Sequence, residues 1–251
     1  MIKDYTGYIR EGFTYSSFYF KKRKEPSRKF LIFTVGRTGS SLLVSLLNSH
    51  QDIECHDELL RKRIFSPNYY IHCKEYLSKK ENFGFKLNTY HFGIQKINHP
   101  QEFVSKLYKL DYRIINLKRR NIFRQVFSHM YALYRKKFFH KKDQGEQELP
   151  PIFIDTRELD KELAFFEKHF QIEEKIINSF PNLCIHYEND LLENEDHQIT
   201  VDRICDYLGI QHARVYSNHV KTTPKDLSIV IENYEEVFDY IKKTKYKNDL
   251  Q

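Results

Sequence analysis

Tryptophan is absent from this sequence of 251 residues, and its four cysteines are far apart. Cys55, Cys73, Cys184 and Cys205 form no Cys-x-x-Cys pair, which argues against both a disulfide framework and a zinc cage. Long hydrophobic runs are missing too, since no stretch approaches the roughly 20 apolar residues that a membrane-spanning helix needs. The first residues, MIKDYTGYIREGF, carry charges and no apolar core of signal-peptide length. These absences predict a cytoplasmic protein with reduced cysteines, no membrane span and no metal.

Basic residues are in excess, because 41 Lys and Arg face 34 Asp and Glu, for a formal net charge of +7. Such an excess suits a polyanionic ligand. Nucleic acid is not the expected partner, since no zinc-finger spacing, ribonucleoprotein motif or helix-turn-helix signature stands out. The densest basic run, Lys21-Lys22-Arg23-Lys24, is short and falls in residues 1–28, which we interpret as an N-terminal arm or a helix packed late on the core. The abundance of Lys, Ile, Asn and Phe is typical of an AT-rich bacterial genome.

Residues 29–251 are expected to form one domain, because their length suits a single core. Apolar runs alternate with helical patterns along them. Strands are expected at residues 30–35, 83–88, 112–117 and 182–187, helices at 40–49, 101–110, 121–137, 157–179, 199–208 and 226–243, and a loop at 140–151. This order predicts an α/β fold: a single-domain, P-loop-like parallel sheet flanked by helices on both faces. Ligands of such sheets bind at the carboxyl ends of the strands.

The segment KFLIFTVGRTGSSLLVSLLNSH, residues 29–50, is a strand that breaks on glycines and opens into a helix. Its free backbone N–H groups and the helix dipole are suited to an anion. A Walker A loop has four residues between its glycines and then Lys. Only two residues separate Gly36 from Gly39 here, and Ser40 stands where lysine would be needed. The nearest positive charge is Arg37, so the loop is not a standard ATPase loop.

The strand at residues 112–117 lacks the acidic residue that normally follows to hold Mg²⁺ in a nucleoside triphosphate site. It leads instead into Lys118-Arg119-Arg120. Arginine forks suit a phosphate monoester, and Ser128, eight residues after Arg120, lies about two turns along the next helix. This spacing favours Arg120 over Arg119. Two metal-free anion sites indicate a ligand with two phosphate-bearing positions.

Taken together, these motifs resemble the sulfotransferase family that uses 3′-phosphoadenylyl sulfate (PAPS). TVGRTGSSLL resembles the 5′-phosphosulfate loop, and INLKRRNIFRQVFSHMYA resembles the 3′-phosphate motif. Other stretches resemble the carbohydrate-type and bacterial branches: LLNSHQDIECHDELL, FGFKLNTYHF, IHYENDLL with ICDYLGI, and IENYEEV. The resemblance covers roughly residues 30 to 240 and is specific through the order and spacing of these motifs.

The resemblance implies PAPS as the cosubstrate, the adenosine bisphosphate PAP as the product, and no metal. It implies that Arg120 and Ser128 hold the 3′-phosphate and that the loop holds the 5′-phosphosulfate through Arg37, Thr38, Gly39, Ser40, Ser41 and Leu42. Arg37 stands where the family often has a lysine. Arginine keeps the charge but hardly deprotonates, so we expect Arg37 to stabilise the leaving group electrostatically.

A general base must take the acceptor's proton during in-line displacement at sulfur. Animal cytosolic sulfotransferases use a His two residues after a Lys, but Asn88 occupies that position here and cannot serve. The carbohydrate-type and bacterial branches use a Glu in a segment like CHDELL, which corresponds to Glu58. Lys86 is expected to point at the sulfuryl group or the leaving oxygen. The alternative bases, or groups that orient Glu58, are His56, Asp57 and His91.

The sequence therefore predicts transfer of a sulfuryl group from PAPS to a hydroxyl or amine. A sugar or glycolipid is the first hypothesis for the acceptor, and a small secondary metabolite is the second. A P-loop nucleotide kinase and a non-catalytic nucleotide-binding module are the rival interpretations. We assign acceptor choice to residues 64–76 and 140–151, and no sequence feature indicates the oligomeric state.

Overall fold

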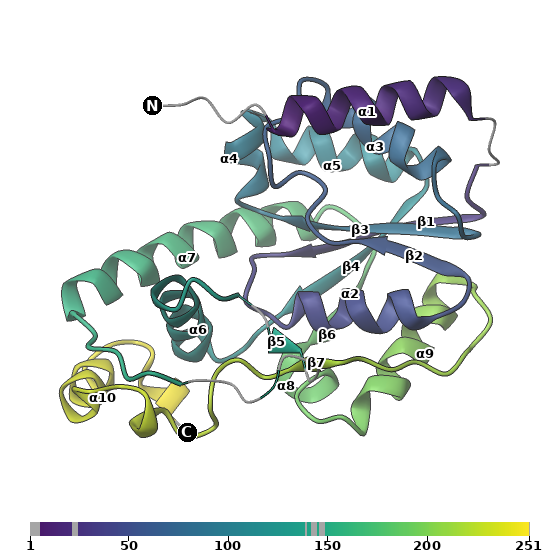
Figure 1. Ribbon diagram of the computed structural model, residues 1–251. Coiled ribbons are helices and arrows are strands. Elements are labelled where there is room, and N and C mark those ends of the chain that lie inside the picture. Colours follow the sequence, from purple (N-terminus) through teal and green to yellow (C-terminus); the bar gives the residue numbers. More distant parts are fainter. Residues whose placement is uncertain (1–5, 22–24, 139, 142–144, 146–148, 251) are drawn as a thin grey trace.

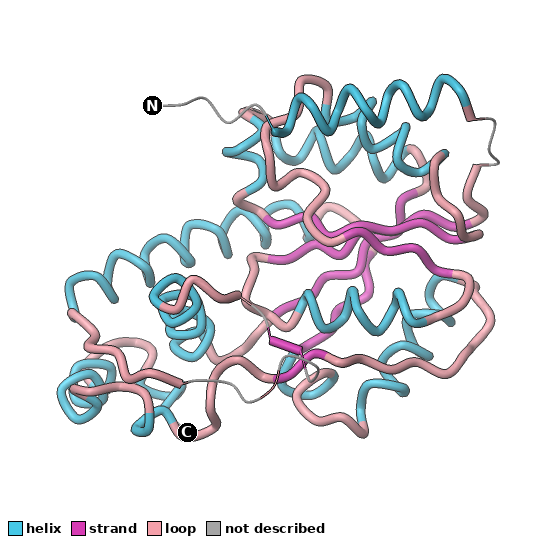
Figure 2. The backbone as a smooth tube through the Cα atoms, in the orientation of Figure 1, coloured by secondary structure: helices cyan, strands magenta, loops and turns pink. Residues whose placement is uncertain are grey.

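The computed structural model describes residues 6–21, 25–138, 140–141, 145 and 149–250. Five parallel strands form one sheet in the order β2-β3-β1-β4-β6 (Figures 1 and 2). These strands are β1 (Arg28–Thr34), β2 (Ile53–His56), β3 (Asn82–Asn88), β4 (Tyr112–Lys118) and β6 (Asn182–His186). A separate antiparallel pair joins β5 (His140–Lys141) to β7 (His219–Val220).

Helices cover both faces of the sheet, as Figure 1 shows. They are α1 (Thr6–Phe20), α2 (Ser40–Ser49), α3 (Pro67–Tyr76), α4 (His91–Gln95), α5 (Pro100–Lys109), α6 (Ile122–Tyr134), α7 (Thr156–Ile177), α8 (Tyr187–Asp190), α9 (Asp196–Leu208) and α10 (Tyr234–Lys242), with 3-10 turns η2 (Leu227–Ile229) and η3 (Lys247–Leu250). This arrangement confirms the predicted α/β fold. In the part of the chain described, no helix combines the length and apolarity needed to cross a membrane.

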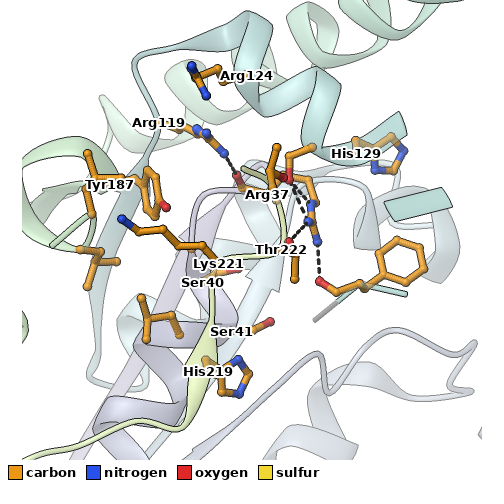
Figure 3. A pocket seen from close by; sticks show the side chains of 18 of the residues that line it. Arg37, Ser40, Ser41, Arg119, Arg124, His129, Tyr187, His219, Lys221 and Thr222 are labelled. Atoms are coloured by element: carbon orange, nitrogen blue, oxygen red, sulfur yellow. Dashed lines mark hydrogen bonds between the residues drawn. The ribbon is translucent and has the colours of Figure 1, made fainter. Parts of the chain in front are cut away.

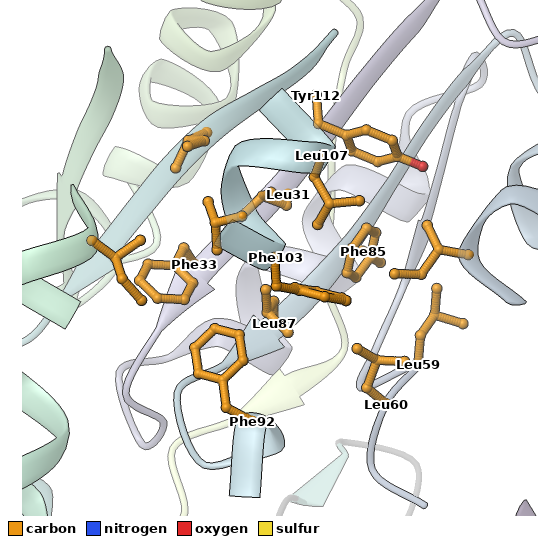
Figure 4. Close-up of a cluster of buried hydrophobic side chains, with 14 of the residues drawn as sticks. Leu31, Phe33, Leu59, Leu60, Phe85, Leu87, Phe92, Phe103, Leu107 and Tyr112 are labelled. Atoms are coloured by element: carbon orange, nitrogen blue, oxygen red, sulfur yellow. The ribbon is translucent and has the colours of Figure 1, made fainter. Parts of the chain in front are cut away.

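Strand β1 separates two halves of the core, because its side chains alternate between the faces of the sheet. Leu31 and Phe33 pack in the cluster under α3 and α5, which Figure 4 shows. Phe30 and Ile32 pack in the cluster under α2 and α9. A strand that is buried on both faces is apolar at successive positions. The run FLIF has this pattern and therefore indicated a buried strand in the sequence.

The order of the strands places the glycine loop at the centre of the sheet. Strand β1 pairs with β3 on one side and with β4 on the other. From β1 the chain goes to the edge strand β2, returns to β3 beside β1, and later crosses to β4 on the opposite side of β1. Ligands of open α/β sheets bind where this direction reverses. The loop after β1 therefore lies at the topological switch point.

Several elements differ from the sequence prediction. Strand β2 and helices α3 and α4 were not predicted. The predicted helix at 226–243 is wrong in its first half, because residues 230–232 pair with Ile152 and α10 begins only at Tyr234. In the predicted loop at 140–151, His140–Lys141 form β5, and residues 142–144 and 146–148 lie outside the described residues. Residues 1–5 and 22–24 of the predicted arm lie outside them as well.

Gly84 in β3 is expected to tolerate no side chain. It pairs in register with Phe30 of β1, and a Cβ atom added to Gly84 would lie 2.2 Å from the Phe30 ring. Because the site is buried between two strands, Gly84→Ala should lower the free energy of unfolding by about 1–3 kcal/mol through overpacking. Denaturant unfolding measures this change. The matched control is Gly93→Ala in α4, where a Cβ meets nothing within 4 Å; equal stability of the two variants would contradict the prediction.

Candidate active site

A cavity of about 1010 Å³ opens at the carboxyl ends of the strands, and residues from all five strand ends line it. They are the loop 35–42 after β1 (without Thr38), Glu58 after β2, Lys86 and Asn88 in β3, Arg119 after β4, and Tyr187 and Glu188 after β6. Helix α6 adds Arg124 and Ser128, and residues 219–225 form a further wall. The structure therefore brings most of the predicted site residues into one cavity.

The lining of this cavity is predominantly cationic. Among the described residues it contains six Lys or Arg and three Glu: Arg37, Lys86, Arg119, Arg124, Lys221 and Lys225, against Glu58, Glu188 and Glu193. Figure 3 shows four of the cations, Arg37, Arg119, Arg124 and Lys221, around the space. Such a concave, positively charged wall concentrates anions. No group of three or more His, Cys, Asp or Glu in the described part is arranged to hold a metal ion.

The glycine loop adopts a conformation that leaves the N-terminus of α2 facing the cavity. Gly36 and Gly39 have φ of 104° and 79°, values that glycine adopts without strain. Gly39 caps α2 and has no side chain that could accept a hydrogen bond from the first N–H groups of that helix. These groups are the natural partners of an anion. Ser40 and Ser41 line the cavity, whereas Thr38 turns inward and hydrogen-bonds Thr34 at 2.7 Å.

Arg37 reaches from this loop across the cavity (Figure 3). Its Nη2 and Nε donate to Ser128 Oγ at 2.8 and 3.2 Å, and its Nη1 donates to the carbonyl of Phe138 at 2.9 Å. Burial, followed by the charge of Arg119, lowers the pKa of Arg37 to about 10, so the group stays charged at neutral pH. The predicted leaving-group residue and the predicted 3′-phosphate serine are thus in direct contact.

Arg119 and Arg120 point to different surroundings. Arg119 lines the cavity, lies over the Tyr187 ring at 4.8 Å and donates to the carbonyl of Arg37 at 3.2 Å. Arg120 is exposed, lies outside the cavity lining, and its Nη1 is 3.5 Å from Asn189 Oδ1. The structure therefore brings Arg119 into the cavity that Ser128 lines, although the sequence spacing favoured Arg120.

Glu58 presents a carboxylate on the other side of the loop. Its Oε1 accepts from Tyr90 Oη at 2.9 Å and from Asn88 Nδ2 at 3.1 Å, and it lies 3.2 Å from Lys86 Nζ. Burial alone would raise the pKa of Glu58, but Lys86, His91 and the Tyr90 hydroxyl together hold it below its ordinary value. The carboxylate is therefore ionised at neutral pH and able to accept a proton.

Lys86 connects the carboxylate to the anion loop. Its side chain is 4% exposed and forms ion pairs with both Asp57 and Glu58. Its ammonium also donates to Ser41 Oγ at 3.4 Å. A buried lysine shared by two carboxylates is held in one place, and here that place lies between the loop and Glu58.

None of the alternative bases lines the cavity, although Asp57 accepts a hydrogen bond from Ser41 and pairs with Lys86 at its edge. His56 Nε2 lies 2.9 Å from Glu54 Oε1, and this hydrogen bond is the main reason why the pKa of Glu54 falls to about 2. His91 is fully buried, and burial lowers its pKa to about 4. Of the predicted bases, Glu58 is the one that lines the cavity.

The backbone is strained at two of the site residues, Arg37 and Glu58. Among the described residues, five other than glycine have positive φ: Arg37, Glu58, Lys96, Asp111 and Lys136. The last three stand where α4, α5 and α6 end, a common place for left-handed backbone. Arg37 (56°) and Glu58 (45°) end no helix. Left-handed conformations of such residues cluster at functional sites, so this is a separate indication of function.

Several lining residues were missed by the sequence analysis. Residues 219–225 contribute Lys221, Thr222 and Lys225, and Thr222 Oγ1 lies 3.4 Å from Arg37 Nη2. Tyr90, which holds Glu58, was not identified either. The sequence signal was weak in both places, because a short polar segment and a single tyrosine have no periodicity that indicates where they lie.

Comparison with solved structures shows a likeness in fold to a sulfotransferase from Alicyclobacillus acidocaldarius. The TM-score is 0.50 and the identity 14%, over 88% of this chain and 92% of that chain. Mouse sulfotransferase SULT7A1 complexed with PAP matches with a TM-score of 0.39 and 16% identity, over 79% of this chain and 64% of that chain. No protein-family model matches the chain, and no curated protein matches it significantly. The likeness to the first structure is one of fold.

Proposed function

We propose that this protein is a PAPS-dependent sulfotransferase that transfers a sulfuryl group to a hydroxyl or amine of an acceptor. One observation carries the proposal: an anion loop and an ionised carboxylate, Glu58, line a single cationic cavity and are connected by Lys86. In-line transfer needs a site for the donor and a base for the acceptor on opposite sides of the sulfur. The fold is also that of a solved sulfotransferase.

The donor is proposed to bind along the switch point of the sheet. The N–H groups of Gly39, Ser40, Ser41 and Leu42, the hydroxyls of Ser40 and Ser41, and the backbone around Thr38 hold the 5′-phosphosulfate. Arg37 stabilises the negative charge that develops on the leaving phosphate oxygen, and Lys86 faces the sulfuryl group. Ser128 holds the 3′-phosphate together with an arginine, for which Arg119 and Arg120 are the two candidates.

Glu58 is proposed to remove the acceptor's proton. The new bond forms between the acceptor oxygen and sulfur, the bond between sulfur and the phosphate oxygen breaks, and the proton passes to Glu58. Among the described residues, the contacts of this carboxylate with Asn88, Tyr90 and Lys86 all use Oε1. Oε2 is therefore the oxygen that faces the acceptor, while the three contacts keep the carboxylate oriented.

A sugar or glycolipid is the proposed acceptor. Aromatic side chains line the cavity, including Tyr90, Phe138, Phe165 and Phe166. Sugar rings present apolar faces that pack on such side chains, and a small secondary metabolite would use the same wall. Composition and cysteine usage favour a bacterial cytoplasmic enzyme.

The proposal predicts metal-independent binding of PAP. Thermal unfolding in the presence of PAP and EDTA should show stabilisation, which rises with nucleotide concentration. Incubation with PAPS and a panel of hydroxylated acceptors, read by mass spectrometry, should then reveal a sulfated product. Stabilisation by ATP with Mg²⁺ but not by PAP would favour a kinase. Binding of PAP without transfer to any acceptor class would favour a non-catalytic module.

A further inference from the structure

Helix α1 has an inverted polarity. A surface helix normally packs its apolar stripe on the protein and turns charges to water. The two charged residues within α1 are Arg10 and Glu11, and both face the protein. Glu11 is 4% exposed and accepts hydrogen bonds from the backbone N–H groups of Phe65 and Ser66 at 2.8 and 3.0 Å. The charged residues of this helix therefore lie on its buried side.

The outward side of α1 is apolar and aromatic. Ile9, Phe13 and Phe20 recur at helical spacing and are 58%, 72% and 79% exposed, and Tyr19 is exposed as well. Phe65, whose N–H donates to Glu11, is 84% exposed beside them. We call these five side chains the α1 face. Figure 1 shows α1 as the outermost helix of its side, beyond α3. Exposure of so many large apolar groups together marks a surface with a partner.

We propose that the α1 face docks on an anionic lipid surface. Tyr and Phe suit the headgroup layer, where an aromatic ring is buried and a hydroxyl stays wet. An interfacial helix also needs positive charge close by, and in the sequence four basic residues, Lys21-Lys22-Arg23-Lys24, follow Phe20 directly. Lys21, the described member of this run, is exposed.

Charge favours a membrane over a second copy of this chain. In a symmetric dimer the same patch faces itself, so the basic run of each copy would be added to the same interface. Like charges brought into one interface repel, whereas anionic headgroups neutralise them. The outward side of α1 carries no acidic residue, so α1 of a second copy would offer no carboxylate to pair with the basic residues.

Helix α1 packs through its buried side, opposite the α1 face, on the segment that carries Glu58. Arg10 Nη2 donates to the carbonyl of Leu59, the residue after Glu58. A Cβ atom added to Gly7 would lie 2.1 Å from the carbonyl oxygen of Arg63, so helix and segment are in close contact. Docking through α1 would therefore hold this segment near the lipid surface. This last step rests on the proposed function, and it favours a lipid-linked acceptor.

A single tryptophan tests the docking directly, because the chain contains none. In Phe13→Trp, the emission should shift to the blue when vesicles of phosphatidylcholine and phosphatidylglycerol are added, and the shift should weaken with salt. Tyr216→Trp, at a position that is 71% exposed elsewhere, should show no shift. An unchanged emission of Phe13→Trp in the presence of vesicles would overturn the proposal.

A second measurement uses vesicle sedimentation of the whole chain. The triple variant I9S/F13S/F20S should partition onto these vesicles at least about tenfold less than the unaltered chain. F153S/Y216S/I229S, which removes similarly exposed side chains elsewhere, should partition normally. If light scattering instead shows a dimer that only the first variant dissociates, the face is a contact between copies and the proposal fails. The assay contains no nucleotide, so failure here leaves PAP binding and the proposed activity untouched.

Discussion

Glu58→Gln is expected to lower the rate of sulfuryl transfer by about 10²- to 10⁴-fold, the usual contribution of a positioned general base. Glutamine keeps the shape of the side chain and an oxygen that can accept from Tyr90 and Asn88, but it cannot take a proton. Lys86 keeps its ion pair with Asp57 in this variant. The affinity for PAP should therefore stay unchanged while the turnover falls.

Single-turnover kinetics and a PAP titration together measure this separation. Glu102→Gln, an exposed glutamate in α5, is the matched control and should leave both quantities unchanged. The pH profile supplies a further check. The base acts when ionised, and the pKa of Glu58 lies below its ordinary value of 4.5, so activity should fall only as the pH drops through that acidic range. A Glu58→Gln variant with near-normal turnover would assign proton removal to another group.

Arg119→Ala is expected to weaken PAP binding by about 10- to 100-fold, the range for charge-assisted hydrogen bonds to a phosphate. Arg120→Ala should leave it nearly unchanged. The two arginines are neighbours in sequence, but Arg119 lines the cavity and stacks on Tyr187, whereas Arg120 is exposed. This pair of variants provides its own control for charge.

Comparison of two nucleotides shows whether Arg119 contacts the 3′-phosphate or only supports the loop at Arg37. Isothermal titration with PAP and with AMP, which lacks the 3′-phosphate, should show that Arg119→Ala loses affinity mainly for PAP. Equal losses for both nucleotides would mean that Arg119 acts through the carbonyl of Arg37 that it holds at 3.2 Å. A larger loss in Arg120→Ala would return the 3′-phosphate to Arg120, as the spacing to Ser128 predicted.

The central strands and the glycine loop could be predicted from the sequence because their signals are local. The run FLIF is apolar on both faces of β1, and the pattern of leucines after Ser40 has the period of α2. Strand β2 could not be predicted, because it has four residues and owes its conformation to pairing with β3 at the edge of the sheet. Its prediction would have required knowledge of the neighbouring strand.

Sequence reasoning led to cavity-lining residues where a motif carries them and missed those that only tertiary structure brings there. The family resemblance pointed to Glu58 and Lys86, and both line the cavity. The choice between Arg119 and Arg120 depends on where β4 ends, since one residue more or less turns a side chain to the other face. Residues 219–225 reach the cavity from a distant part of the chain, and tertiary structure alone brings Lys221 there.

The left-handed backbone at Arg37 and Glu58 has a consequence for how the protein balances folding against activity. Each such residue costs about 1–3 kcal/mol relative to relaxed backbone, and glycine would remove most of that strain. Selection for stability of the folded state alone would therefore favour glycine at both positions. The chain instead carries arginine at position 37 and glutamate at position 58. Two strained backbone positions therefore hold side chains that line the cavity.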